Sequence, residues 1–298
     1  MVSPEAEAIR TRIKQMMRST LQLDAPLATR RAQYEASMSR GHLPADMQVE
    51  AVTVETLTAE WVSVPQAASS QVMLYLHGGG YIMGSCHSHR LLAAALAQAT
   101  GARVLVLDYR LAPEHPFPAA LEDAQAAYRW LVTTGIKPEH IVLAGDSAGG
   151  GLALSTLLAL RDAGQELPAK AILLSPWTDL SVSGASILTR AERDFMITRD
   201  YLLAEAHTYL GEQDPRTPLA SPVYADLHGF PPLLIQVGSD EILLDDATRV
   251  AESAQQAGVA VTLDIIEGMW HVWHAAAAVR YFPEGKAAFD QIADFVRR

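Results

Sequence analysis

Residues 140–160 read HIVLAGDSAGGGLALSTLLAL, an apolar strand pattern that passes through a serine into an apolar helix pattern. Within it, residues 145–149 match G-x-S-x-G around Ser147. Chance alone places that pentapeptide in on the order of one chain in ten, so the strand before it and the helix after it are the stronger evidence for a sharp turn. Such a turn exposes the Ser147 hydroxyl at a helix N-terminus, where negative charge is favoured. A helix N-cap would explain the serine but not the glycines around it.

Short apolar runs recur on both sides of this turn and alternate with helical patterns. From residue 72 onward most runs are continuously apolar, as expected for strands buried on both faces of a parallel sheet. The alternation predicts an α/β fold with a doubly wound, mostly parallel sheet whose first two strands form an antiparallel edge. The eight expected strands are residues 49–54, 61–64, 72–76, 104–107, 141–144, 172–174, 233–237 and 261–266, and the expected flanking helices are residues 90–100, 119–133, 148–163, 245–257 and 284–298.

Two segments fall outside this alternation. Residues 1–45 have a helical pattern and precede the sheet, and residues 178–225 hold a helical piece between polar and Pro-rich stretches. A long excursion inside a compact domain commonly builds a lid or a binding wall. We expect both segments to form a small helical cap over the carboxyl edge of the sheet, where such sheets bind ligands, with residues 46–298 otherwise forming the catalytic domain. Surface helices without a function are the alternative.

The composition narrows the class of protein. The chain has 298 residues, of which 49% are hydrophobic, and a formal net charge of −11, which suits a folded domain and excludes a disordered chain. An acidic chain without a Lys/Arg cluster is not expected to bind nucleic acid. Cys86 is the one cysteine, which excludes an intrachain disulfide and a cysteine-based metal cluster. It has no neighbouring base in the sequence, so we expect a buried or bystander thiol.

The sequence also bears on location. Its first residues, MVSPEAEAIRTRIKQMM, are charged and amphipathic and lack the apolar core of a secretion signal. No apolar run approaches the roughly 20 residues that cross a bilayer. We therefore expect a cytoplasmic protein without a membrane span, secretion being the alternative if a leader has been removed.

A serine nucleophile needs a base, and the base needs an acid to orient it. In this architecture the acid and then the histidine follow the serine, each on a loop after a later strand. The loop after residues 233–237 carries the acid, and we favour Asp240 over Glu241 and Asp245 because Asp240 lies at the strand end. Asp240 would fix the tautomer of the base.

The base is expected on the loop after the last strand. His271 follows residues 261–266 directly, and we favour it over His274, which falls where a further helix could begin. His271 would accept the proton of Ser147.

A glycine loop, residues 77–81 (HGGGY), follows the third expected strand. Glycines leave backbone N–H groups uncovered, so that an oxyanion can approach them. We expect the N–H groups of Gly78, Gly79 and Ala148 to form an oxyanion hole. A phosphate-binding loop is the alternative, but the lysine of that motif is missing and no helix begins at once.

The HGGGY loop, the stretch DYRLAPEHPFPAA at residues 108–120, the GDSAGG turn and the late Asp and His together resemble the hormone-sensitive-lipase-like family of bacterial carboxylesterases. The resemblance covers about residues 45–298, and the helical N-terminus matches the cap of that family. It implies the α/β-hydrolase fold, with Ser147, Asp240 and His271 as the catalytic residues. The sequence departs from the family where residues 271–273 read HVW instead of the frequent HGF, and where residues 240–243 read DEIL instead of a loop with DPL.

This resemblance implies a serine carboxylesterase that hydrolyses short- to medium-chain acyl esters through an acyl-enzyme, with no metal or organic cofactor. A lactone hydrolase or an N-acetyl hydrolase would use the same triad. A non-catalytic small-molecule receptor on this fold is a further alternative, against which the presence of both Ser147 and His271 argues. Candidate pocket walls, which core packing would explain equally well, are Tyr81, Met83, Trp177, Phe195, Met196 and Trp270. The edge of residues 261–266 is a candidate homodimer interface, because members of the family often dimerise through the last strand.

Overall fold

An eight-stranded sheet with the order β1-β2-β4-β3-β5-β6-β7-β8 organises the protein. The computed structural model describes residues 2–17 and 25–298. β2 pairs antiparallel with β1 and β4, whereas all other neighbouring strands are parallel. The expected mostly parallel sheet with an antiparallel edge is thus confirmed. The strands are β1 (Gln48–Val54), β2 (Leu57–Ser63), β3 (Ala68–Leu76), β4 (Ala102–Leu107), β5 (Ile141–Asp146), β6 (Lys170–Leu174), β7 (Leu233–Gly238) and β8 (Val261–Ile266).

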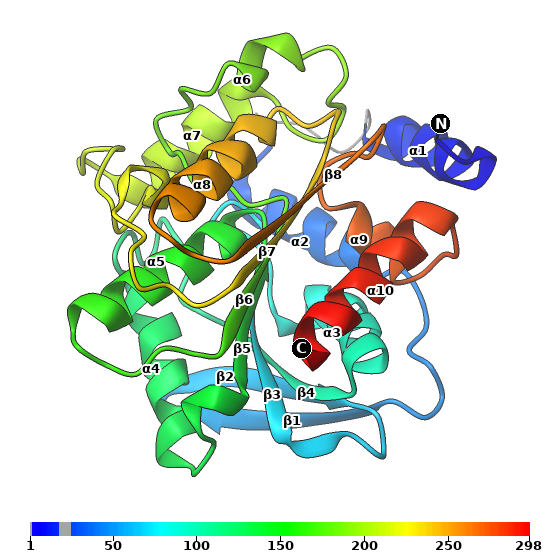
Figure 1. The fold of residues 1–298 in the computed structure, drawn as a ribbon. Helices are drawn as coiled ribbons and strands as arrows, with labels where there is room; N and C mark the ends of the chain where they lie inside the picture. The colour runs from blue at the N-terminus through cyan, green and yellow to red at the C-terminus, as the bar shows by residue number, and fades with distance from the viewer. Residues whose placement is uncertain (1, 18–24) are drawn as a thin grey trace.

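Helices cover both faces of the sheet (Figure 1). Alternate side chains of β3 point to opposite faces, so Leu74 belongs to one buried cluster while Met73 and Tyr75 belong to another. Helices contribute buried residues to both clusters, which is why the central strands are apolar on both faces. These helices are α4 (Ala119–Thr133), α5 (Ala148–Asp162) and α8 (Leu244–Gln256) on one face, and α3 (Cys86–Thr100) and α10 (Pro283–Arg297) on the other.

Some of the helices outside this framework line the cavity that contains Ser147. Two of them, one near the N-terminus and one between β6 and β7, line that cavity and are joined by an ion pair of 3.0 Å between Arg30 and Glu205. Near the N-terminus, the hydroxyl of Ser3 donates a hydrogen bond of 2.7 Å to the carboxylate of Glu284, which connects the start of the first helix to α10. These elements are α1 (Pro4–Met17), α2 (Leu27–Met38), α6 (Ser186–Thr189), α7 (Arg199–Leu210) and α9 (Trp273–Ala277), with short 3-10 turns at Pro138–His140 and Pro222–Tyr224. In the described ranges we find no helix with the length and apolarity needed to cross a membrane.

Candidate active site

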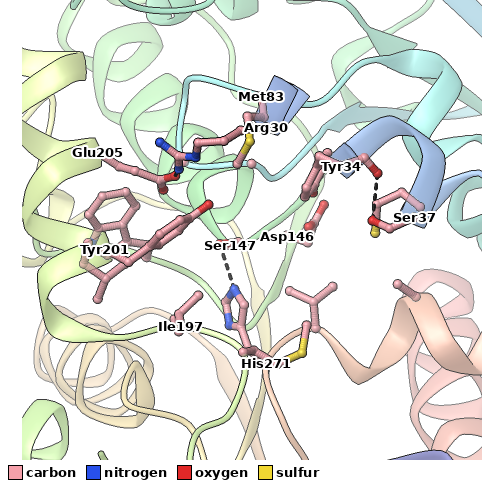
Figure 2. A pocket seen from close by; sticks show the side chains of 18 of the residues that line it. Arg30, Tyr34, Ser37, Met83, Asp146, Ser147, Ile197, Tyr201, Glu205 and His271 are labelled. Carbon is pink, nitrogen blue, oxygen red and sulfur yellow. Dashed lines mark hydrogen bonds and ion pairs between the residues drawn. The ribbon is translucent and has the colours of Figure 1, made fainter. Parts of the chain in front are cut away.

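Ser147 occupies a strained turn between β5 and α5. Its backbone has φ 52° and ψ −122°, a conformation that costs free energy for a residue with a side chain. The flanking glycines allow this turn because a Cβ on Gly145 would overlap the carbonyl of Gly149, and a Cβ on Gly149 would overlap the carbonyl of Leu76. The turn places the Ser147 hydroxyl in a cavity at the carboxyl end of β5 (Figure 2).

His271 lies between Ser147 and a buried carboxylate. Its Nε2 is 2.8 Å from Ser147 Oγ, and its Nδ1 is 2.9 Å from Glu241 Oε2 (Figure 2 shows the first contact). With the proton on Nδ1, this nitrogen donates to Glu241 and Nε2 accepts from the serine hydroxyl. Glu241 is fully buried, and its other oxygen accepts hydrogen bonds of 2.7 Å from Ser175 Oγ and 2.6 Å from the N–H of Gly238.

The electrostatics of this group favour a basic imidazole. Burial lowers the pKa of His271, but the hydrogen bond to Glu241 and then the charges of Glu241 and Asp194 raise it above its ordinary value. A raised pKa lets the ring hold a proton taken from the serine. The arrangement can therefore activate a hydroxyl and stabilise the resulting imidazolium.

Asp240, the acid favoured from the sequence, does not contact His271 in the structure. Its Oδ2 lies 2.7 Å from Arg10 Nη1 and its Oδ1 lies 3.5 Å from Arg193 Nη1. After β7 the chain turns sharply, with the N–H of Glu241 donating to the carbonyl of Gly238 at 3.3 Å. Consecutive side chains consequently point apart, Asp240 toward α1 and Glu241 beneath the imidazole.

The other rejected candidates are held elsewhere. Asp245 accepts a hydrogen bond of 3.0 Å from the N–H of Ser186, and His274 Nε2 lies 3.0 Å from Gln236 Oε1. Burial lowers the pKa of His274 to about 3, so this ring stays neutral. Neither Asp245 nor His274 forms a hydrogen bond with Ser147.

The glycine loop also differs from expectation at its first glycine. The N–H of Gly78 donates to Asp146 Oδ1 at 3.0 Å, so it is not available to an oxyanion. Gly79 and Gly80 line the cavity instead, and within residues 2–17 and 25–298 their N–H groups have no acceptor. Ala148 is the first residue of α5, so its N–H has no acceptor within the helix. A substrate oxygen that lies beside Ser147 can accept hydrogen bonds from the N–H groups of Gly79, Gly80 and Ala148.

Asp146 supports the loop from behind. Besides Gly78, it accepts a hydrogen bond of 2.6 Å from Tyr75 Oη and lies 3.5 Å from His89 Nε2. Burial raises the pKa of Asp146, but His89 and the Tyr75 hydrogen bond outweigh burial and lower it to about 2. Asp146 is therefore a permanent anion that fixes the start of the glycine loop.

A mostly apolar cavity of about 160 Å³ opens beside Ser147 and His271 (Figure 2). Of the expected wall residues, Met83, Trp177 and Met196 line it. Tyr81 does not line the cavity; its ring stacks on that of Tyr209, with 3.8 Å between the ring centroids. The ring centroids of Phe195 and Trp270 are 6.1 Å apart, and Trp270 lines a neighbouring groove. Three of the six residues expected to line the pocket therefore do so, and three do not.

Other lining residues come from α2 and α7, which lie in the two segments expected to form a cap, although no sequence pattern singled out the individual residues. Arg30, Tyr34, Tyr201 and Glu205 line the cavity, with Arg30 pointing toward Glu205 in Figure 2. Glu205 is 2% exposed, and burial raises its pKa to about 8 against the lowering effects of Tyr201 and Arg30. These residues give one side of the cavity a polar edge.

No cluster of side chains suited to hold a metal ion occurs in the described part of the chain. Cys86 is buried, and burial followed by the charge of Asp108 raises the pKa of its thiol. A thiol held protonated in this way is a weak nucleophile.

Comparisons with known proteins identify the family of this chain. A model of the alpha/beta hydrolase fold family matches residues 73–275. The chain is 48% identical to an acetyl-hydrolase of Streptomyces hygroscopicus, over all of this chain and 97% of that protein. It is 36% identical to an ethyl acetate hydrolase of Pseudomonas putida, over 69% of this chain and 66% of that protein. Among solved structures, it is similar to an esterase from the bacterial hormone-sensitive lipase family, with a TM-score of 0.94, 45% identity and coverage of 100% and 98%.

Proposed function

Because this chain belongs to the alpha/beta hydrolase fold family, among the esterases of the bacterial hormone-sensitive lipase family, and is a carboxylic ester hydrolase, we propose that Ser147, His271 and Glu241 carry its catalysis. The single observation that supports these roles is the continuous chain of hydrogen bonds of 2.8 Å and 2.9 Å through the imidazole.

The reaction follows from these contacts. Ser147 Oγ attacks the ester carbonyl while its proton passes to His271 Nε2, and Glu241 stabilises the imidazolium that forms. The N–H groups of Gly79, Gly80 and Ala148 bind the negative oxygen of the tetrahedral intermediate. His271 then protonates the departing alcohol, which leaves an acyl-enzyme. A water molecule, deprotonated by the same imidazole, attacks the acyl group. As the bond between the acyl carbon and Ser147 Oγ breaks, the imidazolium returns the proton to Oγ, which releases the acid and the free serine.

The nucleophile is tested with Ser147→Ala and p-nitrophenyl acetate. We expect kcat to fall by about 10⁴-fold or more, because the oxyanion donors alone provide little turnover. Ser155→Ala, a change in the same helix, should keep most of the activity. Circular dichroism confirms folding of both variants. Activity retained by Ser147→Ala, with contamination excluded, would falsify the assignment.

We propose short- to medium-chain acyl esters as substrates. The relatives named ethyl acetate hydrolase and acetyl-hydrolase support small acyl groups, and the cavity of about 160 Å³ that Met83 and Trp177 help to line fits them. A panel of p-nitrophenyl esters from acetate to palmitate should show kcat/KM falling at the long end.

An acetyl-hydrolase acting on N-acetyl groups is the second candidate, favoured by the name of the relative that is 48% identical. Cleavage of an amide needs stronger protonation of the leaving group than cleavage of an ester. The geometry of the site does not tell the two reactions apart. Adding an N-acetyl amide and a lactone to the same panel separates the three activities.

Residues 1–45 and 178–225 are proposed to act together as a cap. The Arg30–Glu205 ion pair supports this, because it joins the two segments at the cavity. Hydrogen exchange in α2 and α7 should slow when phenylmethylsulfonyl fluoride occupies Ser147. Unchanged exchange in both helices would refute a shared cap.

We also propose a homodimer through β8 and a cytoplasmic location. β8 ends the sheet order, and Ile265 on it is 46% exposed. Light scattering should give twice the chain mass, and Ile265→Asp should give the monomer; a monomeric mass for the unaltered protein rejects the dimer. Cell fractionation tests the location.

A further inference from the structure

A second groove adjoins the active-site cavity. It has a volume of about 380 Å³ and lies between α1, the connection that follows α2, and α9. The two spaces share a wall, because the same five residues line both of them: Ser37, Met38, Met196, Val272 and Ala275. The two spaces are therefore direct neighbours.

The groove combines apolar walls with positive charge. Ile9, Ile13 and Trp270 provide apolar surface, whereas Arg12, Arg40 and Arg280 are its charged lining residues. None of the described residues that line the groove is a carboxylate. In a chain with a net charge of −11, this excess of arginine is a local reversal of charge.

None of these three arginines has a counter-ion among the described residues. Among the residues that the structure describes, neither Arg12 nor Arg280 forms an ion pair, and Arg40 contacts the sulfur of Met16 at 2.8 Å. Arg10, which lies on the same helix as Arg12, is by contrast paired with Asp240 at 2.7 Å. The groove thus presents guanidinium groups that an anion can approach without displacing a carboxylate.

The position of the imidazole indicates which arm of an ester enters the groove. In the proposed mechanism His271 Nε2 protonates the departing oxygen, so the alcohol arm begins beside His271. Val272 and Ala275 continue from that residue and line both spaces. Trp177 and Leu202 line the first cavity and not the groove, which leaves that side to the acyl group.

We propose that the enzyme acts on esters of alcohols that carry an apolar chain with an anionic end group, and that Arg12, Arg40 and Arg280 bind this anion. The inference rests on the proposed function and adds the class of alcohol to it. Guanidinium groups bind carboxylate and phosphate alike, so the shared chemistry is the negative charge.

The test compares matched acetate esters that differ at the far end of one chain. These are ω-acetoxyoctanoate, ω-acetoxyoctyl phosphate and the neutral ω-acetoxyoctanamide. We expect kcat/KM for at least one anionic ester to exceed that of the amide by about tenfold, the sum of three exposed ion pairs. The excess should shrink when the salt is raised to about 0.5 M, because exposed charges are then screened. The preferred anion identifies the end group, and equal rates for all three esters would overturn the proposal.

Variants locate the effect. In Arg12→Gln/Arg280→Gln the ratio of anionic to neutral ester should fall to about one or two, since two of the three charges are gone. Arg129→Gln, an exposed change on α4, should leave the ratio unaltered. A ratio is insensitive to loss of folded enzyme, so an unchanged ratio in the double variant rejects the groove as the binding site. Absence of p-nitrophenyl acetate hydrolysis by the unaltered protein would instead reject the proposed function itself.

Discussion

Asp194 Oδ2 accepts a hydrogen bond of 2.9 Å from the backbone N–H of Ile242, the residue that follows Glu241. Its other oxygen accepts from the N–H groups of Met196, at 2.8 Å, and Ile197, at 3.1 Å, both of which line the cavity. One buried carboxylate therefore fixes the loop of the acid and the wall of the cavity at the same time. Burial is the main cause that raises the pKa of Asp194 to about 6.

The first prediction concerns the pH profile of Asp194→Asn. The charge of Asp194 is one of the causes that raise the pKa of His271, and neutral His271 is the active form of the free enzyme. Removing the charge lowers that pKa, so the ascending acidic limb of kcat/KM should move to lower pH. The measurement is kcat/KM for p-nitrophenyl acetate between about pH 4 and 8.

A matched control for this profile is Asp200→Asn, an exposed change on α7. It should keep the limb of the unaltered protein. If Asp194→Asn lowers activity equally at every pH, Asp194 acts by holding the loop alone and its electrostatic role is refuted.

The second prediction separates Glu241 from Asp240. Glu241→Gln should lower kcat by about 10³- to 10⁴-fold, because Gln cannot stabilise the imidazolium or hold its tautomer. Asp240→Asn should keep kcat within about tenfold, since it removes an ion pair to Arg10 and touches no reacting group. Steady-state kinetics of the two purified variants provide the comparison, and the reverse order of activities would return the acid to Asp240.

The third prediction concerns the anion behind the glycine loop. The pKa of Asp146 is about 2 in the folded protein and about 3.8 when unfolded, so its charge stabilises the fold above pH 4 and that contribution is lost as the pH falls through 2. Asp146→Asn should therefore lower the free energy of unfolding by about 2 kcal/mol at pH 7, and by much less at pH 2. Urea denaturation at both pH values measures this difference.

Asp162→Asn, at an exposed ion pair with Arg161, is the control and should change stability by well under 1 kcal/mol. A loss for Asp146→Asn that is equal at both pH values would show that its charge contributes nothing to folding.

Much of this fold could be predicted because it follows from local pattern. The continuously apolar runs mark β3 and β5 to β7, and the glycines around Ser147 mark the turn that exposes it. These signals lie within a few residues of the features they predict. Ser147 and His271 could be proposed for the same reason, since each directly follows a recognisable strand.

The details that sequence missed depend on contacts between distant segments. Asp240 and Glu241 are neighbours of similar chemistry, and the partner that draws Asp240 away is Arg10 on α1. The sequence suggested Gly78 for the oxyanion site, but its N–H donates to Asp146, a residue far along the chain that the local pattern could not reveal as its partner. The position of Glu205 in the cavity had no signal in the sequence, because its ion-pair partner Arg30 lies on the distant helix α2. In each case a long-range ion pair or hydrogen bond selects between local alternatives.

The last prediction concerns His274, the histidine that is three residues from the base. Its ring is fully buried and bonded to Gln236, so His274→Ala should leave a cavity and an unpaired amide and destabilise the fold by about 2–4 kcal/mol. Because burial lowers the His274 pKa to about 3, the folded protein excludes a proton that the unfolded chain binds below about pH 6.5. Its stability therefore falls with pH from about 6.5 toward 3, and the variant should lose part of that dependence. Activity per folded molecule should be retained in His274→Ala and abolished in His271→Ala, as active-site titration against calorimetric unfolding would measure; a folded, inactive His274→Ala would mean that this ring takes part in the reaction.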